Sequence, residues 1–168
     1  MSTTALISMA EYMETSYEPD AEYADGVIVE RNAGKKSHSK VQGRILVWFT
    51  TTYPDFPAWV EQRVETIPGR RCRIPDVCLT LAEPSVEVFE EAPLICIEGL
   101  SQGDTLSGFM EKFEEYAAFG VPHIWIIDPR RKRAYSFRSG SLEELHGDAL
   151  VTSNPEIRLP LEEVFRGL

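Results

Sequence analysis

Two acidic side chains stand at the ends of neighbouring apolar segments, where they could do chemistry together. Asp76 opens the run "PDVCL", and Glu98 follows the run "LICI". Side chains alternate along a strand, so Asp76 shares one face with Cys78, and Glu98 shares one face with Cys96. Antiparallel pairing with Cys78 opposite Cys96 would place Asp76 opposite Glu98, with their Cβ atoms about 5 Å apart.

Two carboxylates at this separation repel each other unless a proton or a cation lies between them. Mg²⁺ prefers oxygen ligands, keeps several waters, and is commonly held by one or two carboxylates and substrate phosphate oxygens. We therefore expect Asp76 and Glu98 to hold Mg²⁺, with Mn²⁺ as the alternative ion. The competing interpretation is local: Asp76 would belong to a turn, and Glu98 would cap the following helix.

The elements that must position this pair follow from hydrophobic periodicity. The spacing predicts helices over residues 37–52 and 104–120, and shorter helices over residues 8–13 and the C-terminal tail. Strands are predicted at 27–30, 58–67, 74–81, 94–97, 124–127 and 134–137, and Asp25-Gly26 indicates a hairpin. Segments 94–97, 104–120 and 124–127 make a βαβ unit with parallel strands. The sequence thus predicts one α/β domain over residues 1–168 with a mixed sheet.

The charge balance works against nonspecific attraction to nucleic acid. The 168 residues include 17 Lys and Arg against 27 Asp and Glu, a formal charge of -10. Binding to phosphate must therefore depend on local basic clusters, although each cluster could equally be solvated loop charge. The candidates are Lys35, Lys36, Lys40 and Arg44, then Arg70, Arg71 and Arg73, and then Arg130, Arg131, Lys132 and Arg133.

Two further properties narrow the class of protein. No apolar run approaches the length of a membrane helix, and residues 1–10 do not have the pattern of a secretory signal. We expect a cytoplasmic protein without a membrane partner. The three cysteines, Cys72, Cys78 and Cys96, lack CxxC spacing. They predict neither a disulfide framework nor a zinc site, and are expected to be reduced and partly buried.

Five segments together resemble a known family. In order they are "AEYADGVIV", "SHSKVQGRIL", "RIPDVCL", "PLICIEGLS" and "KFEEYAAFGVPHIWIIDP". Over about residues 22–137 they are similar to the Uma-type restriction endonuclease family, within the PD-(D/E)xK nuclease superfamily. The resemblance implies a restriction-endonuclease-like α/β fold, a mixed β-sheet flanked by helices, with Mg²⁺ at the paired acids. It makes Asp76 and Glu98 the metal ligands and adds Glu22 as a further acid.

The lysine of that superfamily is displaced in this chain. Its usual place, two residues after the acid, is occupied by Leu100, and the resemblance points instead to Lys112 on the next helix. Lys112 lies about 100° from the centre of the helix's apolar face. It could therefore reach inward or remain at the rim. His38 matches a histidine of the family, but a single histidine at a helix start is more commonly a cap or surface residue.

The function implied by the resemblance is a Mg²⁺-dependent endonuclease that hydrolyses DNA phosphodiester bonds with a metal-activated water. The implied catalytic residues are Asp76, Glu98, Lys112 and Glu22. The nucleic-acid contacts expected beside the site are Arg70, Arg71 and Arg73. A homodimer is expected if both strands of a duplex are cut. The alternatives are a noncatalytic binding or assembly module, which Leu100 and the acidity favour, and a metal-dependent phosphoesterase acting on small substrates.

Overall fold

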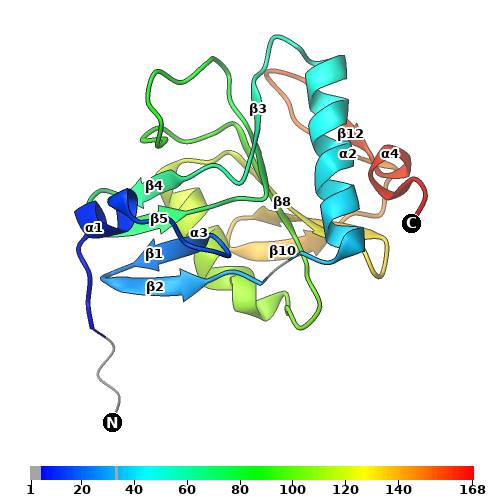
Figure 1. The fold of residues 1–168 in the computed structure, drawn as a ribbon. Helices are drawn as coiled ribbons and strands as arrows, with labels where there is room; N and C mark the ends of the chain where they lie inside the picture. Colours follow the sequence, from blue (N-terminus) through cyan, green and yellow to red (C-terminus); the bar gives the residue numbers. More distant parts are fainter. Residues whose placement is uncertain (1–4, 33) are drawn as a thin grey trace.

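The computed structural model describes residues 5–32 and 34–168, which form two larger β-sheets, a small two-stranded sheet and flanking helices (Figure 1). The helices are α1 (Met9–Glu14), α2 (Lys36–Thr52), α3 (Met110–Phe119) and α4 (Leu161–Phe165), and a 3₁₀ turn, η1 (Ser107–Phe109), leads into α3. Among the described residues, no helix combines the length and the apolar character needed to cross a membrane.

The central sheet has six strands in the order β10-β9-β8-β7-β6-β3. Their bounds are β3 (Ala58–Val60), β6 (Val77–Leu79), β7 (Ile95–Gly99), β8 (His123–Asp128), β9 (Arg133–Arg138) and β10 (Ser141–Glu144). Strands β7 and β8 are parallel, as the βαβ pattern predicts, and the other neighbours are antiparallel. The α/β class with a mixed sheet flanked by helices is therefore confirmed.

A second sheet of four strands, in the order β2-β1-β5-β4, lies beside the first. Its strands are β1 (Ala21–Ala24), β2 (Val27–Glu30), β4 (Val64–Ile67) and β5 (Arg71–Arg73). The hairpin between β1 and β2 turns at Asp25 and Gly26, whose φ angles are 49° and 89°. A two-residue hairpin turn of type I′ requires positive φ at both central residues, and Asp-Gly is one of the pairs that adopt it most often.

Two predicted strands are wrong in extent. Residues 58–67 form not one strand but two, β3 and β4, which belong to different sheets. Glu61 lies between them with a φ of 50°, and this left-handed residue redirects the chain. The predicted strand at 74–81 is reduced to β6, because the preceding segment passes from the second sheet to the first. Strand β5 was not predicted.

The helix predicted over 104–120 begins later than expected. Asp104 instead closes a turn by accepting a hydrogen bond from the Ser101 backbone N–H at 2.8 Å, and the α-helix starts only at Met110. Its end at Gly120 is confirmed, with the left-handed φ of 108° that favours glycine. The helix predicted over 37–52 and the two short terminal helices are confirmed with small changes in their limits.

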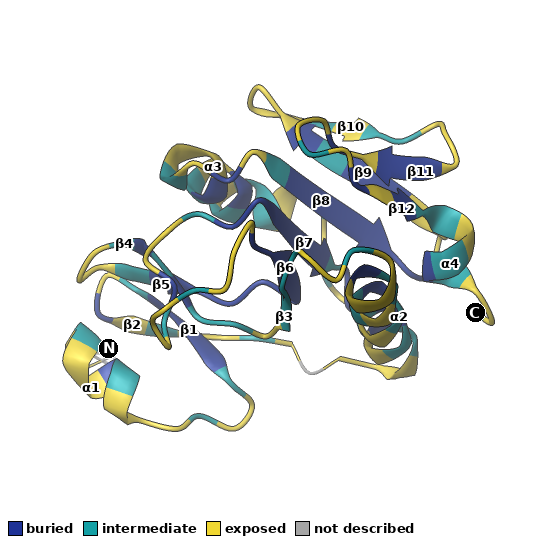
Figure 2. Ribbon diagram, turned by 90° about the horizontal axis from the view of Figure 1, so that it is seen from above, coloured by how far each residue is buried: buried dark blue, intermediate teal, exposed yellow. Residues whose placement is uncertain are grey.

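The central sheet has a hydrophobic cluster on each face, and the strands alternate between them. Ile95 and Ile97 of β7 pack in the cluster that contains Val41 and Ile45 of α2, whereas Cys96 packs with Phe113 of α3. In Figure 2, α2 and α4 lie on one side of strands β6 to β9, and α3 lies on the other. Strands β11 (Ala149–Val151) and β12 (Arg158–Pro160) join the α2 side.

The register between β6 and β7 agrees with the sequence prediction. Cys78 pairs with Cys96, and Val77 pairs with Ile97. Continued by one residue, this register sets Asp76 opposite Glu98 at the ends of their strands. All three cysteines are free thiols, as predicted, but they are fully buried and not partly buried.

Candidate active site

The four residues predicted to be catalytic line one pocket, with a volume of about 560 Å³. Its walls are the β1–β2 hairpin, the ends of β6 and β7, and the turn that leads into α3. Glu22 comes from β1, Asp76 precedes β6, Glu98 is in β7 and Lys112 is in the first turn of α3. Three acids and a lysine from four separate segments are thus brought together.

The side chain of Lys112 points into the pocket. From its position on the flank of the helix, the sequence could not distinguish this orientation from one at the rim. The Lys112 Nζ atom lies 2.6 Å from Glu22 Oε1 and 2.6 Å from Glu98 Oε1, and its side chain is 11% exposed. Burial alone would lower the pKa of Lys112, but the charges of the two carboxylates raise it. The ammonium group is therefore kept charged between two acids.

Glu98 is the most unusual of the three acids. Its Oε1 atom also accepts a hydrogen bond of 2.8 Å from the hydroxyl of Tyr116, one turn beyond Lys112 on α3. Burial raises the pKa of Glu98 to about 7; the charges of Asp76 and Glu22 act in the same direction, and Lys112 opposes them. A pKa near 7 means that the protonated and ionised forms of Glu98 are both present near neutral pH.

Glu22 is fixed from several directions. Its Oε1 atom accepts a 3.0 Å hydrogen bond from the Ile74 backbone N–H, and Arg73 donates to its Oε2 atom at 3.1 Å. Burial would raise the pKa of Glu22, but the charges of Lys112 and Arg73 hold it below the ordinary value. Glu22 thus remains ionised and connects the hairpin to the segment that leads to Asp76.

Asp76 is held by three donors. Its Oδ1 atom accepts from Arg31 at 2.7 Å, and its Oδ2 atom accepts from the Gly99 backbone N–H at 2.7 Å and lies 3.0 Å from His38 Nε2. Burial would raise the pKa of Asp76, but His38, Gly99 and Arg31 lower it. The hydrogen bond to Asp76 raises the pKa of His38 in return.

The interpretation of His38 as a cap or surface residue is wrong. His38 is 9% exposed and reaches Asp76 from the first turn of α2. A signal was available, because His38 lies three residues before Val41 and seven before Ile45, on the apolar face of the helix. Arg31 was missed altogether, and its position after a short exposed strand carries no comparable signal.

Close backbone approach shapes the space around His38. A methyl group at Gly99 would lie 2.9 Å from His38 Cδ2, and one at Gly34 would lie 2.7 Å from Nδ1. Within residues 5–32 and 34–168, the buried Nδ1 atom has no hydrogen-bond partner. The Nε2 atom therefore makes the polar contact of this ring, and that contact is with Asp76.

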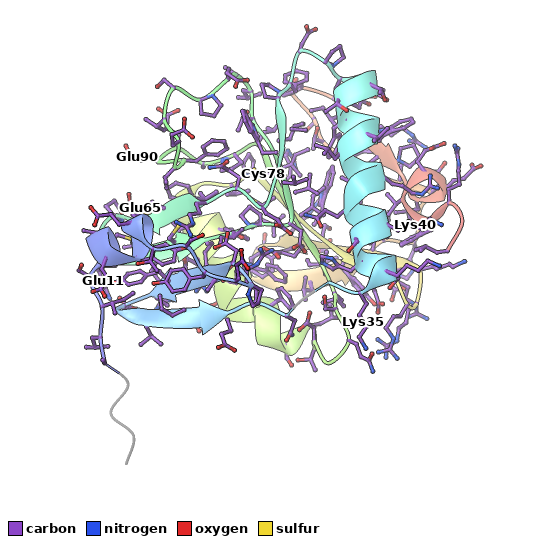
Figure 3. All side chains as sticks on the ribbon, in the orientation of Figure 1. Glu11, Lys35, Lys40, Glu65, Cys78 and Glu90 are labelled. Atoms are coloured by element: carbon purple, nitrogen blue, oxygen red, sulfur yellow. The ribbon has the colours of Figure 1, made fainter. Side chains whose placement is uncertain are left out.

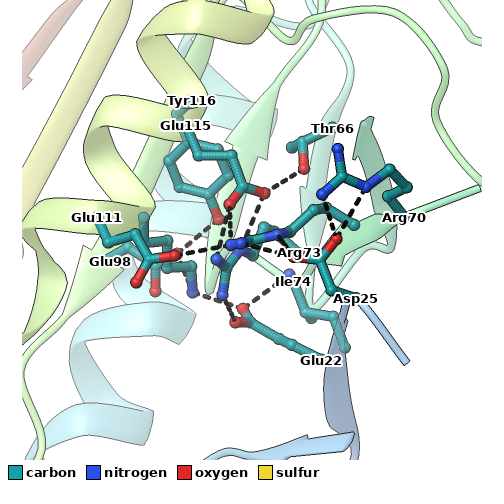
Figure 4. Close-up of polar contacts among 12 residues, drawn as sticks. Glu22, Asp25, Thr66, Arg70, Arg73, Ile74, Glu98, Glu111, Glu115 and Tyr116 are labelled. Atoms are coloured by element: carbon teal, nitrogen blue, oxygen red, sulfur yellow. Dashed lines mark hydrogen bonds and ion pairs between the residues drawn. The ribbon is translucent and has the colours of Figure 1, made fainter. Parts of the chain in front are cut away.

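The three arginines predicted to contact nucleic acid extend along and beside β5, and each one pairs with acids (Figure 4). Arg73, 7% exposed, donates to Glu22 and, at 2.6 and 3.0 Å, to Glu115 of α3. Arg71 contacts Asp25, Glu111 and Glu115, and the exposed Arg70 contacts Asp25. Arg73 thus belongs to the frame of the site. Contact of these arginines with DNA stays a prediction.

The donor set is suited to a hard divalent ion. Asp76 and Glu98 present carboxylate oxygens to one pocket, which are the ligands that Mg²⁺ prefers when it keeps several waters. The Lys112 ammonium already lies between Glu22 and Glu98 and pairs with both carboxylates. In the part of the chain that the structure describes, no three His, Cys, Asp or Glu side chains are grouped as metal ligands. Binding of a metal ion by Asp76 and Glu98 stays a prediction.

Comparisons with known proteins identify the family and the fold of the chain. A family model described as "Uma2: Putative restriction endonuclease" matches residues 9–168. A crystal structure of a "putative nuclease belonging to DUF820" from Anabaena variabilis has the same fold. Its TM-score is 0.78 at 20% identity, over 95% of this chain and 97% of that one.

A more distant match is the cryoEM structure of a DrdV-DNA complex. Its TM-score is 0.33 at 16% identity, and the match covers 75% of this chain and 12% of the other. Among curated proteins, the comparison found no match.

Proposed function

Because the chain belongs to the Uma2 family of putative restriction endonucleases, we propose that it is a Mg²⁺-dependent endonuclease that hydrolyses DNA phosphodiester bonds. The observation that carries the proposal is the position of Lys112. It comes from α3, yet its Nζ atom lies 2.6 Å from Glu98 Oε1. It thereby supplies beside the acid the cation that Leu100 cannot supply.

Asp76 and Glu98 would hold the metal ion. Bound there, Mg²⁺ supplies charge neutralisation at a phosphoryl oxygen and a lowered pKa for an attacking water. The carboxylate of Asp76 has about four lone pairs, so one remains beyond those that Arg31, His38 and Gly99 occupy. Glu22 orients the Lys112 ammonium, and this group has a third N–H for a water or a phosphoryl oxygen. Such a fixed donor contributes most where charge develops in the transition state.

One observation favours the alternative of a noncatalytic binding or assembly module. The acids of the site already have cationic partners within the chain: Lys112 for Glu22 and Glu98, and Arg31 for Asp76. An ion-paired cluster of this kind can serve to fix a fold instead of a reaction. The experiment below separates the two functions.

The test is the cleavage of supercoiled and linear DNA in Mg²⁺ or Mn²⁺ by the wild type and by Asp76→Asn and Lys112→Met. We expect Lys112→Met to be roughly 10² to 10³-fold slower, as when a transition-state donor is removed. Asp76→Asn should lose cleavage because it removes a carboxylate that would hold the metal ion. The control is Asp20→Asn, an aspartate outside the pocket that accepts from a backbone N–H at 2.9 Å and from Arg63 at 3.1 Å. It should cleave like the wild type.

Each result leads to a different conclusion. Cleavage that persists in Asp76→Asn would reject the site. If folded wild type leaves DNA intact but hydrolyses bis(p-nitrophenyl) phosphate, the protein is a phosphoesterase for small substrates. If it hydrolyses neither compound, the binding module is favoured. Circular dichroism and thermal unfolding of each variant show whether a loss of activity is only a loss of folding.

A further inference from the structure

A row of basic side chains follows α2 outside the pocket. Lys36, Lys40 and Arg44 recur every four residues, so successive members are about 40° apart around the helix and the row is about 12 Å long. In Figure 3, Lys40 projects from the outer side of α2. The row begins in the first turn of the helix, two residues from His38 of the site.

The turn between β8 and β9 brings further basic residues to this row. Lys132 Nζ donates to the Leu168 backbone oxygen at 2.8 Å, and Lys40 Nζ donates to the Gly167 oxygen at 2.5 Å. The last residues of the described chain therefore join the two segments. The turn lies beside the lower half of α2, below the C-terminus, in Figure 1. We call Lys36, Lys40, Arg44, Arg130 and Lys132 the α2 basic patch.

In the described part of the chain, acidic side chains neutralise the arginines beside the pocket but not the residues of the α2 basic patch. Among the described residues, none of its five members forms an ion pair with a carboxylate side chain, whereas Arg70, Arg71 and Arg73 all do. In a protein with a formal charge of -10, this is positive charge left available to an external anion.

We propose that the α2 basic patch binds the phosphate backbone of duplex DNA and leads it toward the pocket. The proposal rests on the proposed nuclease function for the identity of the polyanion. A row of about 12 Å spans three to four phosphates at about 3.4 Å per nucleotide along one strand. Lys35 continues the row to the rim of the pocket, because its Nζ atom donates to Gln102, between the lining residues Ser101 and Gly103.

The test measures binding of a labelled 30-base-pair duplex by fluorescence anisotropy in EDTA, over a series of NaCl concentrations. Two double variants probe the patch, Lys36→Gln/Lys40→Gln on α2 and Arg130→Gln/Lys132→Gln on the turn. The control, Arg138→Gln, removes a positive charge at an exposed position away from α2, on β9. The rival surface is probed by Arg70→Gln/Arg71→Gln.

For each patch variant we expect the slope of log K against log[NaCl] to fall in magnitude by roughly 2, since each phosphate contact contributes about 0.9. The control should keep the wild-type slope. The proposal is overturned if the patch variants keep that slope while the Arg70/Arg71 variant loses it. It is also overturned if the wild type binds no duplex at low salt, or binds only phosphatidylserine vesicles.

The two proposals can fail separately. Binding that depends on the patch, without cleavage in Mg²⁺, supports the surface and rejects the nuclease function. Cleavage that is insensitive to all four patch substitutions supports the nuclease function and rejects the surface.

Discussion

Asp76 receives its donors from three segments, and the contribution of His38 can be separated from mere packing. The ring makes its polar contact through Nε2, whereas the buried Nδ1 atom has no partner among the described residues. A side chain that reproduces the Nε2 donor should therefore preserve the orientation of Asp76. His38 is a positioning residue in this arrangement, because it acts on the proposed metal ligand through a hydrogen bond.

We predict that His38→Phe weakens Mn²⁺ binding about 10 to 100-fold, the usual cost of losing a residue that orients a metal ligand. His38→Gln should retain most of the affinity, because its amide can donate from nearly the same place. Calorimetric titration with Mn²⁺ measures both, and His146→Phe, at an exposed histidine, is the control. Equal affinity in wild type and His38→Phe would refute the positioning role.

Gly99 and His38 show how the packing of strand β7 against helix α2 restricts the choice of residue. Strand β7 approaches α2 so closely at Gly99 that a methyl group there would meet His38 Cδ2 at 2.9 Å. Because the contact is with a ring that is itself held by Asp76, it cannot be relieved by a small rotation. Glycine at this position is therefore required by the packing of a strand end against a helix.

We predict that Gly99→Ala lowers the free energy of unfolding by about 1 to 3 kcal/mol, the typical cost of overpacking, and also weakens Mn²⁺ binding. Gly43→Ala is the matched control, because Gly43 lies inside α2 with no atom within 4 Å of the added methyl group. It should raise stability by up to about 1 kcal/mol through helix propensity. Urea unfolding measures the stability of both variants, and calorimetric titration measures Mn²⁺ binding. If Gly99→Ala leaves the free energy of unfolding unchanged, the close approach is contradicted.

Helix α3 is joined to the second sheet by Glu115, whose side chain is 7% exposed. It accepts from Arg73, Arg71 and Thr66. Burial would raise the pKa of Glu115, but the hydrogen bonds from Arg73 and Thr66 and the charges of both arginines lower it. A carboxyl group with a lowered pKa stabilises the fold above its unfolded pKa and loses that contribution as pH falls.

We predict that Glu115→Gln costs roughly 1 to 3 kcal/mol at pH 7, because it leaves Arg73 with one charged partner fewer. The difference from wild type should shrink as the pH falls from the ordinary Glu pKa of 4.5 toward the lowered pKa of folded Glu115, because the unfolded wild-type chain takes up a proton first. Denaturant unfolding across that range measures it. Glu114→Gln, the exposed neighbour on the same helix, is the control. A difference that grows toward low pH would contradict the ion pairs.

On the scale of the molecule, the C-terminal segment belongs to the same core as the central sheet. Leu159 of β12 and Val164 of α4 are buried in one cluster with Val41 and Ile45 of α2. Through this cluster, the segment supports the helix that carries both His38 and the α2 basic patch. The prediction of one domain over residues 1–168 therefore has a direct thermodynamic test.

We predict that Leu159→Ala, at a position with 0% exposure, destabilises the whole protein by about 2 to 5 kcal/mol. Tryptophan fluorescence and circular dichroism should report the same single transition. Leu81→Ala, at a position that is 60% exposed, should change stability by less than about 0.5 kcal/mol. Two separate transitions, with only one of them shifted by Leu159→Ala, would contradict the prediction of one domain.

Local periodicity was sufficient for much of this fold. The alternation of side chains, together with an assumed antiparallel pairing of Asp76 opposite Glu98, predicted that Cys78 lies opposite Cys96, and the structure has this register. Helical spacing predicted α2 and most of α3. Local periodicity failed where short strands leave too few residues for a period of two, as at β5, and where Glu61 divides one apparent strand between two sheets. The turn at Asp104 likewise hid the true start of the helix.

The sequence by itself determined that Asp76 and Glu98 end paired strands, because that register follows from neighbouring residues. Only the tertiary structure decided which cations meet these carboxylates: Lys112 turned inward, and Arg31 and His38 converged on Asp76. It also decided that Arg70, Arg71 and Arg73 pair with acids, whereas within residues 5–32 and 34–168 no member of the α2 basic patch pairs with a carboxylate side chain. Ion pairs between residues remote in sequence are fixed by how layers pack, and a linear pattern carries no record of that packing.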